Sequence, residues 1–288
     1  MIVSAGRRSY CEQDLTSSYA IVTVLSTISV EYIELAVVLG YSITMNSDVD
    51  CRVDRILVTR IGDDLRNAAR QQLEFAGWTV VQMPAIPNPA SVNVNTVKYA
   101  RYLGCFSKLH VFNMTQYDTV LFLDADTMLC GGIMSLFTAY APRMHEHGAH
   151  LAWVRDSLDM NNPTSPFNTG VMLIRPSATL AELLVANTEH VVFDPSLGDQ
   201  GYLTAVFNTT HDADSVHQKY DILPQKYNLL AHIATTDPVL WRAIRADARI
   251  FHFTWLKPTA SFMALRCAYM GTLHFCNEWA HIRFITRA

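Results

Sequence analysis

The chain has 288 residues, of which 50% are hydrophobic and 17% are charged, and its formal net charge is -4. This composition supports a sizeable apolar core and argues against a disordered chain. The small negative charge, without a run of basic residues, argues against a nucleic-acid-binding surface.

The segment before the first expected strand, residues 1–18, contains Arg7, Arg8, Glu12 and Asp14. It lacks the apolar stretch of a signal peptide, and no part of the sequence is apolar for long enough to predict a membrane span. We therefore expect a cytoplasmic chain. The lumen of the Golgi or of the endoplasmic reticulum is the alternative if the N-terminus is incomplete.

The first part of the chain alternates between short apolar runs and helical patterns. Ala20 to Leu25 is an apolar, β-branched run that predicts a buried strand, and Ser29 is a favourable N-cap for the helical pattern that follows. Further strands are predicted at 55–59 and 79–83, with an amphipathic helix at 63–75 between them. Such alternation is typical of a mainly parallel α/β sheet.

The rest of the chain continues as one α/β unit, because no internal repeat or low-complexity linker divides it. We expect a domain over 19–258, after an N-terminal extension (1–18) and before a C-terminal extension (259–288) that packs on the domain or is partly ordered. The remaining predicted elements are helices at 103–114, 178–190 and 200–207, and strands at 119–123, 151–154, 170–174 and 249–253.

Two aspartates follow the fourth predicted strand directly. Val120 to Leu123 is apolar enough for a central strand, and Asp124 and Asp126 come next with only Ala125 between them. Carboxylates at the mouth of an apolar strand are costly unless their charge is compensated, and a divalent cation with oxygen ligands does so. The alternative is a solvated turn in which Asp126 caps the next segment.

Four segments, in this order, carry a resemblance to a known family. They are 106–127, which ends in Asp124-Ala125-Asp126-Thr127; Phe167-Asn168-Thr169-Gly170-Val171; Gly198-Asp199-Gln200-Gly201; and Phe251-His252-Phe253 with Lys257-Pro258. Over roughly residues 20 to 258 the chain resembles the glycogenin-like retaining glycosyltransferases (glycosyltransferase family 8).

The resemblance implies an α/β fold of the GT-A type, with a central, mainly parallel sheet flanked by helices. It implies transfer of a hexose or hexuronic acid from a UDP-sugar, dependence on manganese with magnesium as the alternative, and retention of anomeric configuration. UDP-glucose, UDP-galactose and UDP-glucuronate stay open as donors. The acceptor stays open among glycans, lipids and small molecules, and a homodimer is compatible with the sequence.

The metal ligands implied by the resemblance are Asp124, Asp126 and His252. A histidine nitrogen beside carboxylates suits manganese, whereas a lone strand histidine is otherwise more often a satisfied core residue. The closing segment, residues 252–259, reads His-Phe-Thr-Trp-Leu-Lys-Pro-Thr. It lacks the glycine of the family's H-F-x-G-x-x-K-P-W pattern and is one residue shorter, and its Trp-Leu-Lys-Pro run is more like plant glucuronosyltransferase-like members.

Catalytic roles are implied for Asp199, Gln200 and Lys257. Gln200 matches the residue near the anomeric carbon, and Lys257 matches a cation that balances the departing UDP. Tyr32 matches an aromatic residue that stacks on the uracil, with a core aromatic as the alternative, and Asp199 also fits a helix N-cap. The implied donor-binding residues are Ser26, Thr27, Tyr32, Lys108, Asp124, Ala125, Asp126, Asn168, Thr169, Asp199, Gln200, His252 and Lys257.

Two other functions compete with an active transferase. One is a catalytically silent scaffold of the same fold that binds nucleotide-sugars, and the intact aspartate pair argues against it. The other is an unrelated phosphotransferase with a D-x-D motif, but the sequence lacks a glycine-rich phosphate loop. Residues 230–249 contain no tyrosine, so we expect no self-glucosylation of the glycogenin kind at that position.

Overall fold

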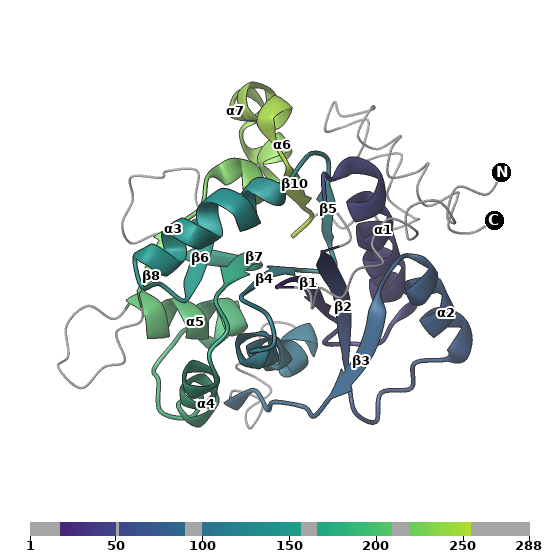
Figure 1. Ribbon diagram of the computed structural model, residues 1–288, viewed down its shortest axis with the longest axis vertical. Coiled ribbons are helices and arrows are strands. Elements are labelled where there is room, and N and C mark those ends of the chain that lie inside the picture. Colours follow the sequence, from purple (N-terminus) through teal and green to yellow (C-terminus); the bar gives the residue numbers. More distant parts are fainter. Residues whose placement is uncertain (1–17, 50–51, 90–99, 157–165, 209–218, 255–288) are drawn as a thin grey trace.

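The computed structural model describes residues 18–49, 52–89, 100–156, 166–208 and 219–254 (Figure 1). A seven-stranded sheet crosses the molecule, and the mainly parallel α/β arrangement expected from the sequence is confirmed. In sheet order its strands are β3 (Thr79–Met83), β2 (Val53–Arg60), β1 (Tyr19–Val24), β4 (Thr119–Leu123), β7 (Phe167–Ile174), β6 (Leu151–Arg155) and β8 (Tyr220–Ile222).

The strand order reverses between β1 and β4. Strand β1 pairs in parallel with β2 on one side and with β4 on the other, so the chain moves outward to β3 and then returns across β1. Strand β7 is antiparallel to both of its neighbours. Open α/β sheets bind ligands at such a reversal, beyond the carboxyl ends of the strands. The ends of β1 and β4 therefore lie at the expected ligand edge.

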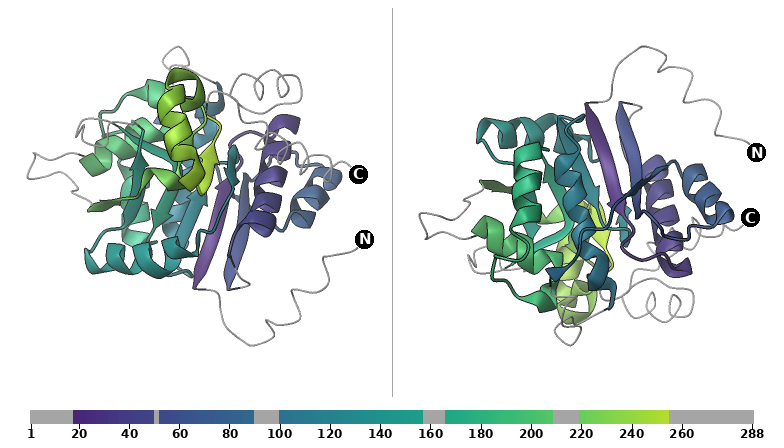
Figure 2. Two further views of the ribbon diagram at one scale, coloured as in Figure 1. Left: turned by 90° about the horizontal axis from the view of Figure 1, so that it is seen from above. Right: turned by 90° about the horizontal axis from the view of Figure 1, so that it is seen from below.

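Helices cover both faces of the sheet, which explains why its central strands are apolar on both sides (Figure 2). Ile21 and Leu121 point into one core cluster, and their neighbours Val22 and Phe122 point into the other. The covering helices are α1 (Val30–Asn46), α2 (Asn67–Phe75) and α3 (Ala141–Glu146) on the first face, and η4 (Ala100–Asn113), α4 (Ala178–Ala186) and α5 (Asp199–Asn208) on the second.

A second, three-stranded sheet joins distant parts of the chain. Its strands, in order, are β5 (Thr127–Leu129), β10 (Ile250–His252) and β9 (Leu229–Leu230). Strands β10 and β5 are antiparallel with His252 opposite Thr127, and the N–H of Phe253 donates to the carbonyl of Asp126 at 2.9 Å. This pairing brings His252 beside the segment that follows β4.

The remaining described elements are short. None of the helices in the described ranges is both long and apolar enough to cross a membrane. These elements are the π-helix η5 (Leu136–Tyr140), the 3-10 helices η6 (Pro195–Leu197), η7 (Gln225–Tyr227) and η8 (Arg245–Asp247), and the helices α6 (Ile233–Thr236) and α7 (Pro238–Ile244).

Most predicted elements agree with the structure, and the differences have local causes. The strands expected at 79–83 and 119–123 have the observed bounds. The helix expected from Asp63 begins at Asn67, because Gly62 (φ 89°) and the bond from the Arg60 N–H to the Asp63 carboxylate close a turn first. The helix expected at 103–114 is the 3-10 helix η4. Strands β5, β8 and β9 were not expected.

Several expectations fall partly or wholly outside the described residues. The N-terminal extension is described only at its last residue, Ser18, and the C-terminal extension is not described. Lys257 also lies beyond the last described residue, Thr254. The division into an extension, a domain and a second extension therefore stays a prediction.

Ser29 caps α1 as expected, because its side chain accepts the N–H of Tyr32 at 3.2 Å. Ser29→Ala removes this acceptor and should lower the free energy of unfolding by about 1 kcal/mol. Ser29→Asp keeps an acceptor and should retain the wild-type value or exceed it. Urea denaturation measures both, and an equal loss in the two variants would show that the hydrogen bond to the side chain at position 29 does not stabilise the protein.

Candidate functional site

The first part of the site is the acidic turn at the end of β4. Strand β4 is buried along its whole length, and the chain leaves it at Asp124, whose N–H donates to the Gly170 carbonyl at 2.8 Å. Thr127 closes the turn, because its N–H and its hydroxyl both donate to the Asp124 carbonyl, at 3.0 and 2.7 Å. Asp126 and Ala125 are buried, whereas the Asp124 side chain keeps 24% of its surface exposed.

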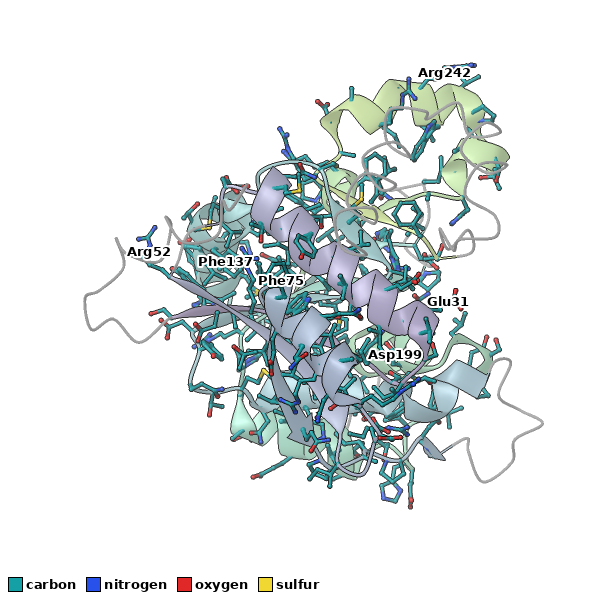
Figure 3. All side chains as sticks on the ribbon, turned by 90° about the vertical axis from the view of Figure 1, so that its right-hand side faces the viewer. Glu31, Arg52, Phe75, Phe137, Asp199 and Arg242 are labelled. Carbon is teal, nitrogen blue, oxygen red and sulfur yellow. The ribbon has the colours of Figure 1, made fainter. Side chains whose placement is uncertain are left out.

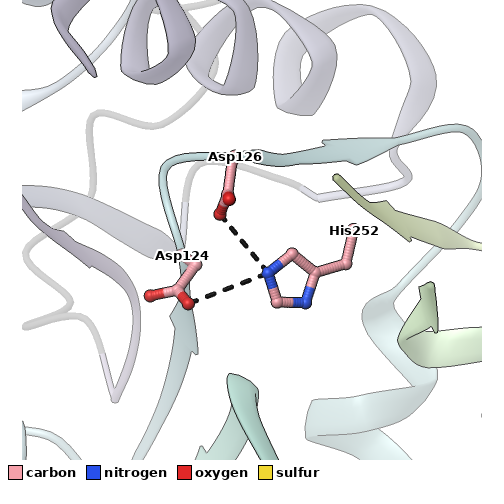
Figure 4. A group of neighbouring side chains, drawn as sticks. All are labelled: Asp124, Asp126 and His252. Atoms are coloured by element: carbon pink, nitrogen blue, oxygen red, sulfur yellow. Dashed lines mark ion pairs between the residues drawn. The ribbon is translucent and has the colours of Figure 1, made fainter. Parts of the chain in front are cut away.

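His252 joins the two aspartates from β10, as Figure 4 shows. Its Nε2 lies 3.3 Å from Oδ1 of Asp126 and 3.8 Å from Oδ2 of Asp124. One ligand atom of each residue lies within 4.8 Å of the other two. Adjacent ligands of an octahedral ion at 2.0–2.1 Å are about 3 Å apart. These three residues could therefore hold a single divalent cation, and they are the ligands that the family resemblance implies.

Gly170 leaves the space that the His252 ring occupies. A Cβ atom on Gly170, in the buried strand β7, would collide with the imidazole. The glycine of the Phe-Asn-Thr-Gly-Val segment is therefore required for the histidine to reach the aspartates. His252 itself is 3% exposed, so its ring is held between β7 and the acidic turn.

Lys108 of η4 supplies a buried positive charge to the same edge. Its Nζ lies 3.0 Å from Oδ1 of Asp124 and 2.8 Å from Oδ2 of Asp199, the first residue of α5. Asp199 is labelled among the side chains in Figure 3. Burial disfavours the charged ammonium, but the two carboxylates outweigh it and raise the pKa of Lys108 well above its usual value. Thr169 also donates to Asp199, at 2.7 Å. Lys108, Thr169 and Asp199 thus form one buried cluster.

One ammonium does not neutralise the three carboxylates of this site. Desolvation raises the pKa of Asp124, Lys108 opposes the rise, and the nearby Asp126 adds to it. The desolvation of Asp124 therefore outweighs the attraction of Lys108. A cation between Asp124, Asp126 and His252 would add positive charge beside this carboxylate.

A chain of side-chain hydrogen bonds links the other polar residues. Asp156 accepts from Asn168 Nδ2 and from Gln200 Nε2, both at 3.0 Å. Asn228 donates to Asn168 Oδ1 at 2.8 Å, and its own Oδ1 lies 3.1 Å from Nδ1 of His252. Asn168 and Gln200, both expected at the donor sugar, therefore connect to the expected metal ligand.

The sequence analysis did not select Asp156 or Asn228 as site residues. A signal for Asp156 was present, because it follows the apolar strand β6 as Asp124 follows β4. Asn228 lies in the Tyr-Asn-Leu segment at 227–229 and is fully buried. A fully buried asparagine needs partners for its amide, but burial is not visible in the sequence.

The residues expected to bind the nucleotide lie near the end of β1. Ser26 and Thr27 follow this strand, and Gly104 of η4 contacts the Ser26 carbonyl closely enough that a side chain would not fit there. Tyr32 is half-buried on α1 and packs against the core cluster of that face. Its stacking on the uracil stays a prediction.

Comparison with known sequences decides the family. Residues 23–258 match the profile of Glycosyl transferase family 8. The chain belongs to this family. It is 28% identical over 239 residues to UDP-glucuronate:xylan alpha-glucuronosyltransferase 1 of Arabidopsis thaliana, which covers 79% of this chain and 31% of the relative. It is 29% identical over 226 residues to Glycogenin-1 of Oryctolagus cuniculus, covering 77% of this chain and 60% of that protein.

Solved structures confirm the GT-A fold of this family 8 member. The glycosyltransferase GlyE of Streptococcus pneumoniae TIGR4 has a TM-score of 0.55 at 19% identity, over 92% of this chain and 62% of GlyE. The galactosyltransferase LgtC, solved with donor and acceptor sugar analogues, has a TM-score of 0.54 at 15% identity, over 92% of this chain and 95% of LgtC. At these identities the likeness is one of fold.

Lys108→Met should destabilise the protein at neutral pH by about 3 kcal/mol, because it leaves buried carboxylates without their partner. The unpaired carboxyls then have a folded-state pKa above the unfolded value. The loss should therefore be largest at neutral pH and should shrink as acid protonates them.

Urea denaturation at neutral and mildly acidic pH measures this loss. The exposed Lys219 is a matched control, and Lys219→Met should change the free energy of unfolding by less than about 0.5 kcal/mol. A loss in Lys108→Met that does not depend on pH would contradict the assigned charge cluster.

Proposed function

We propose that this chain is a metal-dependent, retaining glycosyltransferase that moves a hexose or hexuronic acid from a UDP-sugar to an acceptor. The observation that carries the proposal is the convergence of Asp124, Asp126 and His252 at the ligand edge of the sheet. The buried pair of Lys108 and Asp199 beside them adds preorganised charge. Membership in family 8 supports the same reaction class.

The proposed cation is Mn²⁺, since two carboxylates and one imidazole suit it, with Mg²⁺ as the alternative. When bound, it would neutralise the donor diphosphate and stabilise the departing UDP. Ser26, Thr27 and Tyr32 are proposed for the nucleotide, and Lys257 for the charge on the leaving UDP.

The donor sugar is proposed to lie against Asp199 and Gln200 at the first turn of α5. Lys108 and Thr169 hold the Asp199 carboxylate, and Asp156 holds the Gln200 amide. Polar groups fixed in this way stabilise charge that develops in a transition state without reorganising.

Retention is proposed to follow from attack on the face from which UDP leaves. In that step the acceptor hydroxyl bonds to the anomeric carbon while the bond to UDP breaks. The hydroxyl proton passes to the leaving phosphate, to which the hydroxyl is hydrogen-bonded. No side chain of this site is proposed as a covalent nucleophile.

The donor is proposed among UDP-glucose, UDP-galactose and UDP-glucuronate. The name of the plant relative specifies UDP-glucuronate and xylan, which makes UDP-glucuronate the first donor to test. The acceptor is proposed to be a separate glycan, lipid or small molecule, because residues 230–249 contain no tyrosine for self-glucosylation. The alternative, a silent scaffold, would bind a UDP-sugar without hydrolysing or transferring it.

The preferred UDP-sugar should raise the melting temperature only when Mn²⁺ is present, since binding to the folded state stabilises it. A thermal-shift screen of the three donors, with and without Mn²⁺, measures this effect. Turnover of the selected donor, by hydrolysis or transfer, then separates the enzyme from the scaffold. A shift that is the same without the metal would contradict metal dependence.

Asp124→Asn and Asp126→Asn should each abolish Mn²⁺-dependent turnover of the UDP-sugar, because each removes a charged ligand. Asp118→Asn is a matched control: Asp118 is exposed and precedes the same strand at its opposite end, so this variant should retain wild-type turnover. Release of UDP measures all three. Unchanged turnover in both ligand variants would exclude the proposed metal site.

A further inference from the structure

We propose that Asn228 favours the tautomer of His252 that carries its proton on Nδ1, so that the lone pair of Nε2 points to the metal site. The inference rests on the proposed metal site, but its first test needs neither metal nor substrate. The argument uses the direction of each hydrogen bond in the chain that links Asp156 to His252.

The orientation of the Asn168 amide is fixed first. The oxygen and nitrogen of a side-chain amide have similar shapes, so its neighbours decide which is which. The backbone N–H of Gly170 can only donate, and it lies 2.9 Å from the atom assigned as Asn168 Oδ1. The Asp156 carboxylate accepts, and it lies 3.0 Å from the other atom, Nδ2. Two independent neighbours therefore require the same orientation.

The orientation of Asn228 follows from that of Asn168. Asn168 Oδ1 is an acceptor, so the Asn228 atom 2.8 Å away must be the donor Nδ2. The Oδ1 of Asn228 then faces Nδ1 of His252 at 3.1 Å. The reversed amide would place two oxygens against each other inside the protein, where Asn228 is 0% exposed. An unsatisfied buried polar group costs about 1–3 kcal/mol, so the reversed state is disfavoured.

An amide oxygen can only accept, so this hydrogen bond requires a proton on Nδ1 of His252. Nε2 lies 3.3 Å from Asp126 Oδ1, which is also an acceptor, so in the metal-free protein Asp126 competes with Asn228 for the proton of the neutral ring. A bound cation would take the lone pair of Nε2 and leave the proton on Nδ1. The opposite tautomer would place a hydrogen on Nε2 between the ring and the carboxylates, where it blocks metal coordination. Asn228 is therefore a positioning residue that acts on the metal through His252. Groups that orient a ligating histidine in this way commonly change metal affinity by 10–100-fold.

The first experiment determines the tautomer in the metal-free wild-type protein. Long-range ¹H–¹⁵N correlation spectra of ¹⁵N-histidine-labelled protein, recorded at a pH where the ring is neutral, show which nitrogen is protonated. Comparison with His252→Gln assigns the signal among the 11 histidines of the chain. We expect a larger share of the Nδ1-protonated tautomer in the wild type than in Asn228→Leu, which lacks the acceptor for that proton. The same distribution of the two tautomers in both proteins would overturn the proposal.

The second experiment measures binding of Mn²⁺ alone by titration calorimetry. Asn228→Leu removes the acceptor and should weaken Mn²⁺ binding by about 10–100-fold. Asn228→Asp loses the donor to Asn168 but keeps an acceptor for Nδ1–H, so it should weaken binding less than Asn228→Leu. Asn187→Leu is a matched control at the C-cap of α4, where the amide bonds only a local carbonyl in the described contacts, and it should leave binding unchanged. Circular dichroism and thermal melting show whether each variant is folded.

Equal weakening in Asn228→Leu and Asn228→Asp would overturn the proposal, since a loss of packing alone would not distinguish them. Failure of the proposed function gives a different result. If Asp124→Asn and Asp126→Asn bind Mn²⁺ as tightly as the wild type, the metal site is wrong, while the comparison of tautomers still tests the hydrogen-bond chain.

Discussion

Negative charge at the carboxyl end of β4 is the constraint on which this site depends. Strand β4 is buried throughout, and Asp124 and Asp126 follow it directly at a largely buried edge of the sheet. Desolvated carboxylates are unfavourable without compensation. Lys108 from η4 supplies a compensating charge, and His252 from β10 supplies a third ligand for the proposed cation. These two elements lie on either side of the acidic turn in the sequence. Residues from both halves of the chain therefore meet at this edge of the sheet, where buried negative charge requires compensation.

Local sequence patterns were sufficient to predict strand β4 and the two carboxylates that follow it. The apolar run before Asp124 predicts both the strand and its end, because a buried central strand must end before charged side chains can follow. The N-cap at Ser29 is equally local, and it is observed. The mainly parallel sheet and a site at the carboxyl ends of its strands follow from the alternation of strands and helices, whereas the order of the strands is known only from the structure.

The positions of His252 and of the residues behind it depend on contacts between distant parts of the chain, which no local sequence pattern predicts. His252 reaches Asp126 only because a three-residue strand, β10, pairs with another three-residue strand, β5, far away in the sequence. A strand was expected at 249–253, where β10 lies, but β5 has too few residues to show a period, so the pairing of the two strands was not predicted. The resemblance to family 8 supplied His252, while the residues on their own left it open between a ligand and a core residue. Asp156 and Asn228 were missed because each looks like an ordinary polar residue until burial and partners are known.

The choice of an amide rather than a carboxylate behind His252 follows from the same charge constraint. Ligating histidines are often oriented by a carboxylate, which also raises their basicity. Here a carboxylate at position 228 would add a further negative charge to an edge that already holds Asp124, Asp126 and Asp199. Asn228 orients the ring with a neutral oxygen instead. The orientation of the Asn228 amide is fixed by Asn168, and that of the Asn168 amide is fixed in part by Asp156. Along this chain of hydrogen bonds the first charged group is Asp156, two amides away from His252, and it also accepts from Gln200.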